Sequence, residues 1–93
     1  MVTRLNDAEI EARLSDLTGW TRQGDVIRKT FQLPSFPSAL SFVVNVGFLA
    51  EAASHHPAID IRWRKVTLSL TTQDAGGLSQ KDFDLALQLD ELV

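Results

Sequence analysis

The sequence contains no cysteine among its 93 residues. Without cysteine the chain forms no disulfide, and no thiolate is available as a nucleophile or a metal ligand. An excess of positive charge is also missing, because nine Lys and Arg residues stand against 12 Asp and Glu residues and give a net charge of −3. Nucleic acids bind basic surfaces, so this balance argues against a nucleic-acid partner.

Long apolar segments are scarce as well. Residues 1–6 contain no apolar run that could serve as a signal peptide. The longest apolar stretch, residues 40–53, is interrupted by Ser41, Asn45 and Glu51. We expect this stretch to be too short and too polar to cross a bilayer, and we therefore predict a cytoplasmic protein with no membrane partner.

The length of the chain fits one domain, which we assign to residues 1–93. Its 44% apolar and 23% charged residues are typical of a globular protein. A domain of this size buries only about 60–65% of the surface of its unfolded chain, so its stability as a monomer should be marginal. We expect the apolar central segment to support self-association.

Apolar periodicity predicts three helices and two pairs of strands. The expected helices span about 7–17, 37–54 and 80 onward, and the expected strands span 20–23, 26–33, 58–63 and 66–71. Asn6 with Glu9, and Ser79 with Asp82, have the spacing of helix N-terminal caps. The order α-β-β-α-β-β-α predicts an α+β fold with a four-stranded antiparallel sheet and helices packed on one face.

Both histidines of the chain, His55 and His56, are adjacent and stand directly before Pro57. Proline cannot continue the apolar helix and favours an extended conformation at His56, so the pair lies where a helix ends and a strand begins. At such a corner an imidazole can point into a cleft, and imidazole exchanges a proton near neutral pH. We regard His55 and His56 as candidate acid/base residues. The alternative is that they only cap the C-terminus of the helix, where a cation is favoured.

The spacing around these histidines resembles that of a known family. Glu51, three intervening residues, His55-His56-Pro57, five further residues and Trp63 are similar to the signature of the pterin-4a-carbinolamine dehydratases. Further similar segments are Gly19-Trp20, Asp60-Ile61-Arg62-Trp63, Ser69-Leu70-Thr71-Thr72, Ala75-Gly76-Gly77-Leu78 and Asp82. The resemblance covers the chain from about Leu5 to Leu92 and implies the same fold that the periodicities predict.

The resemblance implies an enzyme that removes water from 4a-hydroxytetrahydropterin and yields quinonoid dihydropterin, in the recycling of tetrahydrobiopterin. It implies no metal and no organic cofactor, because the pterin is the substrate. Members of the family assemble as dimers and tetramers, so a homodimer or homotetramer is expected. Loss of the 4a-hydroxyl needs one proton delivered to the leaving oxygen and one taken from N5, and two imidazoles can divide these roles. By resemblance His55 is the main acid/base residue, with His56 beside it in the pocket.

One position departs from the family pattern. Nine residues separate Trp63 from the next position of the pattern, where the family usually has a third histidine or a tryptophan. This chain has Gln73 there. Glutamine can hold a pterin edge or the leaving hydroxyl by hydrogen bonds, but it cannot exchange a proton near neutral pH. We therefore expect Gln73 to be a site residue that weakens activity. The alternative function is a non-catalytic dimerisation, assembly or protein-binding module on the same fold.

Three further residues are candidates for substrate binding. Glu51 lies one helical turn before His55, and it either orients that imidazole or forms a plain surface pair with it. Trp63 either stacks on the pterin or belongs to the core together with the isoleucines of its strand. Asp82 either contacts the substrate or serves as an acidic residue in the first turn of the last helix. A metal site is not predicted, because adjacent histidines in extended backbone point to opposite sides and no third ligand is evident.

Overall fold

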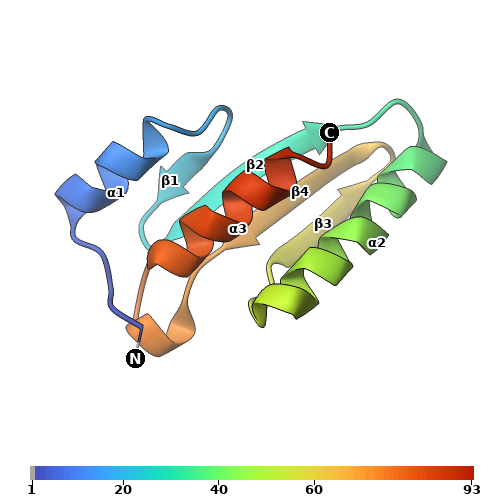
Figure 1. Cartoon of the computed structure of the whole chain (residues 1–93). Helices are drawn as coiled ribbons and strands as arrows, with labels where there is room; N and C mark the ends of the chain where they lie inside the picture. The colour runs from blue at the N-terminus through green and yellow to red at the C-terminus, as the bar shows by residue number, and fades with distance from the viewer. Residues whose placement is uncertain (1) are drawn as a thin grey trace.

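Three helices cover one face of a four-stranded antiparallel sheet (Figure 1). The computed structural model describes residues 2–93. Its elements are α1 (Asp7–Leu14), β1 (Thr21–Gln23), β2 (Val26–Gln32), α2 (Phe36–Ala53), β3 (Ala58–Arg62), β4 (Lys65–Leu70), the 3-10 helix η1 (Gln73–Ala75) and α3 (Gln80–Asp90). The predicted order α-β-β-α-β-β-α and the predicted α+β class are confirmed.

Both predicted helix caps are formed. The Glu9 backbone N–H donates to Asn6 Oδ1 at 2.8 Å, and the Asn6 backbone N–H donates to Glu9 Oε1 at 2.9 Å. Ser79 and Asp82 form the same reciprocal arrangement at the start of α3. Each cap satisfies backbone donors that the first turn of a helix leaves without partners, so these short polar motifs define where α1 and α3 begin.

The sheet has the strand order β1-β2-β4-β3, so β2 and β4 are its central strands. Side chains alternate between the two faces of a strand, and the apolar ones of β2 and β4 point towards the helices. The strands bury Ile27, Phe31, Val66, Leu68 and Leu70 in the core. The opposite face of the sheet is open and polar, with Thr30 Oγ1 and Thr67 Oγ1 2.8 Å apart across the central pair.

Helix α2 corrects one expectation. It has 18 residues with a hydropathy of 1.4, so by length and composition alone it is long and apolar enough to cross a membrane, contrary to the prediction. Its inner side nevertheless packs against α3 and β4, with Ala39, Phe42, Val46 and Ala50 buried. Only 22% of the helix is buried, so one side of α2 packs on the core and the rest of its surface is exposed.

Strand β3 is an edge strand, paired only with β4. The strand begins at Ala58, two residues after His56, and ends at Arg62, one residue earlier than predicted. Trp63 and Arg64 then form the turn to β4, with Trp63 in the left-handed conformation (φ 55°). A strand advances about 3.3 Å per residue, so Trp63 and the two histidines lie at opposite ends of β3.

Candidate active site

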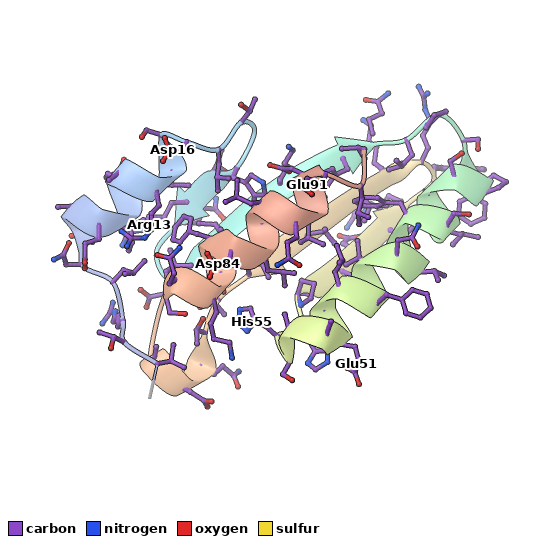
Figure 2. All side chains as sticks on the ribbon, in the orientation of Figure 1. Arg13, Asp16, Glu51, His55, Asp84 and Glu91 are labelled. Atoms are coloured by element: carbon purple, nitrogen blue, oxygen red, sulfur yellow. The ribbon has the colours of Figure 1, made fainter. Side chains whose placement is uncertain are left out.

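The corner after α2 sets the direction of the His55 side chain. Ser54 ends α2 in the left-handed conformation (φ 50°, ψ 41°), and the His55 backbone N–H donates to the Ala50 carbonyl at 3.0 Å. The side chain therefore leaves the path of α2 and lies between the end of α2 and the beginning of α3 (Figure 2). The predicted position of the histidines between a helix and a strand is confirmed.

His55 is held by a buried carboxylate. Its Nε2 atom lies 2.6 Å from Asp82 Oδ1, and Asp82 is completely buried while His55 is 8% exposed. The two residues are 27 positions apart in the chain. A short contact of this kind between an imidazole and a carboxylate fixes the ring orientation and determines which nitrogen carries the proton.

The second oxygen of Asp82 is also enclosed by donors. Thr72 Oγ1 lies 2.7 Å from Asp82 Oδ2, and the Ser79 backbone N–H donates to the same oxygen at 3.0 Å. Ser79 Oγ lies 2.7 Å from Thr72 Oγ1, so the Ser79 hydroxyl can donate to Thr72 while Thr72 donates to Asp82. With these partners the carboxylate acts as an acceptor, and His55 Nε2 is its donor.

This arrangement leaves His55 Nδ1 open. Among residues 2–93, every buried side-chain nitrogen or oxygen has a hydrogen-bond partner. Nδ1 makes no hydrogen bond to the described part of the chain, so it must reach solvent. With the proton on Nε2, the lone pair of Nδ1 is available to accept a proton from a bound molecule.

A pocket of about 610 Å³ lies in front of the imidazole. It is formed by the end of α2, the adjacent ends of the sheet strands, η1 and the first turn of α3. The lining residues are Val26, Arg28, Ser54, His55, His56, Ala58, Ser69, Thr71, Thr72, Gln73, Asp74 and Lys81. Its volume is within the range of small-molecule sites, about 300–1,000 Å³. The structure thus brings together His55, His56 and Gln73, the three residues predicted to be catalytic.

The predicted contact between Glu51 and His55 is wrong. Glu51 Oε1 lies 2.7 Å from His56 Nε2 instead, and both side chains are mostly exposed, at 79% and 68%. Figure 2 shows Glu51 near the end of α2, away from His55. The helical i,i+4 relation does not extend to His55, because α2 ends at Ala53 and Ser54 turns the backbone.

The prediction that Trp63 belongs to the core is wrong, and its stacking on the pterin stays a prediction. The side chain is 82% exposed, so it is not part of the core, and it does not line the His55 pocket. It lies at the far end of β3, where its ring meets Phe36 edge-on with the ring centroids 6.3 Å apart. The cause is the turn at residues 63–64, which interrupts the alternation that would have placed Trp63 on the same face as Ile59 and Ile61.

The position of Asp82 differs from the predicted contact with the substrate. Its carboxylate lies behind His55 and has no exposed surface, so it acts on the pocket through the imidazole. It is also the acidic residue of the α3 cap. The alternative prediction, an acidic residue in the first turn of the last helix, is therefore confirmed. Its partner Thr72, and the pocket residues Arg28 and Lys81, were not identified from the sequence, because nothing in their local spacing marks them.

The chemistry available here is proton transfer. No serine or threonine hydroxyl in residues 2–93 is hydrogen-bonded to His55, so the arrangement lacks the nucleophile that an acyl-transfer triad needs. Residues 2–93 also contain no group of three or more His, Cys, Asp or Glu side chains placed to hold a metal ion. What remains is an oriented imidazole with one free nitrogen, a second imidazole beside it and a polar amide from Gln73.

Comparison with known sequences points to one family. The family described as pterin 4 alpha carbinolamine dehydratase has a profile that matches residues 3–92. A relative from Roseiflexus sp. (strain RS-1) is 82% identical over 93 residues, covers the whole of both chains and is provisionally named a pterin-4-alpha-carbinolamine dehydratase. A protein from Chloroflexus aurantiacus with the same provisional name is 52% identical over 90 residues, which is 97% of each chain.

Solved structures share the fold. The crystal structure of a transcriptional coactivator/pterin dehydratase from Brucella melitensis matches with a TM-score of 0.93 at 25% identity, over 97% of this chain and 98% of that one. A pterin dehydratase-like protein, identified as a RuBisCO assembly factor in the alpha-carboxysome, matches with a TM-score of 0.65 at 20% identity, over 78% of this chain and 84% of that one. The second likeness concerns the fold alone. The resemblance indicated by the spacing around His55 is confirmed.

Proposed function

Because this chain belongs to the family of the pterin-4a-carbinolamine dehydratases, we propose that it removes water from a 4a-hydroxytetrahydropterin and releases the quinonoid dihydropterin. In this reaction the C4a–O bond breaks and the N5=C4a double bond forms. One proton leaves N5, and another joins the departing hydroxyl, which is released as water. The pterin is the substrate, and the proton transfers require no metal or organic cofactor. We place this activity in the cytoplasm, in the recycling of tetrahydropterin.

The His55–Asp82 pair is the observation that supports this function. In the proposed mechanism Asp82 holds the proton of His55 on Nε2, and the imidazole, which lines the pocket, accepts a proton through Nδ1. In the proposed mechanism Nδ1 removes the proton from N5 as the C4a–O bond breaks. The imidazole becomes positively charged at that moment, and the buried carboxylate 2.6 Å away stabilises the charge.

His56 and Gln73 complete the proposed site. His56 is exposed and lies beside Glu51, so it can take a proton from water and deliver it to the leaving hydroxyl. The side chain of Gln73 makes no hydrogen bond within residues 2–93, and it lines the pocket at the start of η1. Its amide is therefore free to hold the pterin edge or the departing hydroxyl.

Turnover of an enzymatically generated 4a-hydroxytetrahydropterin tests this function. We expect the native chain to dehydrate the compound well above the spontaneous rate. Gln73→His adds a group that exchanges protons near neutral pH, and we expect it to raise kcat by roughly 100-fold, the low end of what general acid/base groups contribute. Stopped-flow absorbance measures both rates. Turnover of the native chain at the spontaneous rate, with no gain in the variant, would contradict the proposed activity.

We also propose that the protein is a homodimer or homotetramer that associates through α2 and β3. Four apolar side chains at intervals of four residues form a stripe along the outer side of α2. These residues are Phe36 (46% exposed), Leu40 (43%), Val44 (58%) and Phe48 (70%). Strand β3 adds exposed Ile59 and Ile61, and its outer edge is unpaired in the sheet. A second copy of the chain would present the same stripe and the same edge, which a two-fold interface requires.

Sedimentation velocity tests the association. We expect the native chain to sediment as a dimer or tetramer at micromolar concentration. Val44→Glu places a charge in the middle of the stripe, where burial in an interface would leave it unpaired, and should weaken association by at least about tenfold. Leu87→Glu is the matched control, because Leu87 is a similarly exposed apolar residue (49%) on α3. A native monomer at this concentration would refute the proposed association.

A non-catalytic assembly or protein-binding module on the same fold is the second candidate function, and the exposed stripe on α2 favours it. Such a module would tolerate the loss of His55 and would depend on Val44 and its neighbours. A dehydratase would instead lose its activity when His55 is replaced.

A further inference from the structure

Two positively charged side chains line the His55 pocket without a carboxylate partner. Arg28 donates only to neutral oxygens, from Nε to Ser69 Oγ at 3.1 Å and from Nη1 to Gln23 Oε1 at 2.9 Å. The half-buried Lys81 makes no side-chain hydrogen bond or ion pair within residues 2–93. Of the other basic residues in the range 2–93, Arg4, Arg22, Lys29 and Arg62 each pair with an aspartate, whereas Arg13, Arg64 and Lys65, which lie outside the pocket, do not.

The position of Lys81 in the helix is electrostatically unfavourable for a cation. The residue lies in the first turn of α3, where the backbone N–H groups already produce a positive potential and a cation is disfavoured. Asp74 is the single acidic residue among the residues that line the pocket, and it pairs with neither cation. An anion bound in the pocket would offset this excess of positive charge.

We infer that this pocket, which Arg28 lines from β2 and Lys81 from α3, binds an anionic group, a phosphate or a carboxylate, carried by the side chain of the pterin. The inference rests on the proposed function and defines its substrate class. The pterin ring is uncharged in its 2-amino-4-oxo form, so the ring alone gives the two cations no counter-charge. Carbon C6, which bears the side chain, is bonded to N5, the atom from which His55 removes the proton. A bound substrate that presents N5 to His55 therefore directs its side chain towards the wall of the same pocket.

Fluorescence titration with oxidised pterins, which do not react, tests the inference. The probes are neutral 6-hydroxymethylpterin, its phosphate ester and 6-carboxypterin. We expect the native chain to bind at least one of the anionic probes about tenfold more tightly than the neutral one, as one charge-assisted contact provides. The preference should decrease as salt increases. The phosphate and carboxylate probes distinguish the two kinds of anion.

The variants locate the anion. Lys81→Gln and Arg28→Gln should reduce the preference to about twofold or less, since each removes one of the two charges. Lys65→Gln and Arg64→Gln change the net charge equally, lie outside the pocket and should keep the native preference. Equal binding of all three probes by the native chain, or the same loss of preference in the control variants, would overturn the inference, and so would a failure to bind any probe.

The readout separates this inference from the proposed activity. Preferential binding of an anionic pterin without turnover would leave the anion site standing and refute the dehydratase function. Turnover with equal kcat/KM for neutral and anionic substrates, together with equal binding of the probes, would support the dehydratase function and refute the anion site.

Discussion

Replacing His55 with alanine is expected to lower dehydratase turnover by roughly 100- to 10,000-fold, the usual contribution of a positioned general acid/base group. The physical reason is that Nδ1 of His55 is the one imidazole nitrogen in the pocket that a buried carboxylate both orients and stabilises when it becomes charged. Stopped-flow absorbance with the 4a-hydroxytetrahydropterin substrate measures the loss against the spontaneous rate.

Two controls separate lost chemistry from lost structure in His55→Ala. Removal of the ring leaves Asp82 Oδ1 without its partner, so the fold must be checked by circular dichroism and thermal unfolding. Imidazole added to the buffer can occupy the space left by the ring, and partial recovery of turnover would identify the missing proton acceptor. His56→Ala provides the comparison, because His56 is exposed and held only by Glu51, and its effect should be smaller. Unchanged turnover in His55→Ala would refute the assigned role.

Replacing Asp82 with alanine is expected to reduce the free energy of unfolding by about 3–5 kcal/mol, because each buried donor that loses its acceptor costs about 1–3 kcal/mol. The carboxylate is completely buried, and three groups lose their acceptor together: His55 Nε2, the Thr72 hydroxyl and the Ser79 backbone N–H. The same change removes the acidic residue of the α3 cap, which adds to the loss. Urea denaturation followed by circular dichroism measures the change.

Asp84→Ala is the matched control for this experiment. Asp84 lies two residues further along α3 and is exposed on the outer side of the helix (Figure 2). Its carboxylate accepts one hydrogen bond, from the Gln80 amide at 2.9 Å, so the change should cost no more than about 0.5 kcal/mol. Asp82→Asn tests the second role of the carboxylate. It keeps the shape of the side chain but offers His55 an amide, and it should lower kcat by roughly tenfold to a hundredfold. If Asp82→Ala and Asp84→Ala lost the same stability, the buried network would not have the importance assigned to it.

The sequence by itself determined the fold and the family. The caps at Asn6 and Ser79, the alternation in β2 and β4 and the break at Pro57 depend on neighbours within about four residues, so the local pattern was sufficient to predict them. The same holds for the spacing from Glu51 to Trp63, which indicated the family now shown by the comparisons. It also placed both histidines at the end of α2, where the structure has them.

The tertiary structure alone decided which side chains meet. His55 pairs with Asp82, 27 residues away, because α2 and α3 pack side by side on the sheet, and no local spacing encodes that contact. Ser54, in the left-handed conformation, turns the backbone so that Glu51 contacts His56 instead of His55. The turn at residues 63–64 places Trp63 at the far end of β3, beside Phe36. Lys81 and Arg28, far apart in the chain, share one pocket for the same reason. Local structure follows from interactions between near neighbours, whereas the site depends on how whole elements pack.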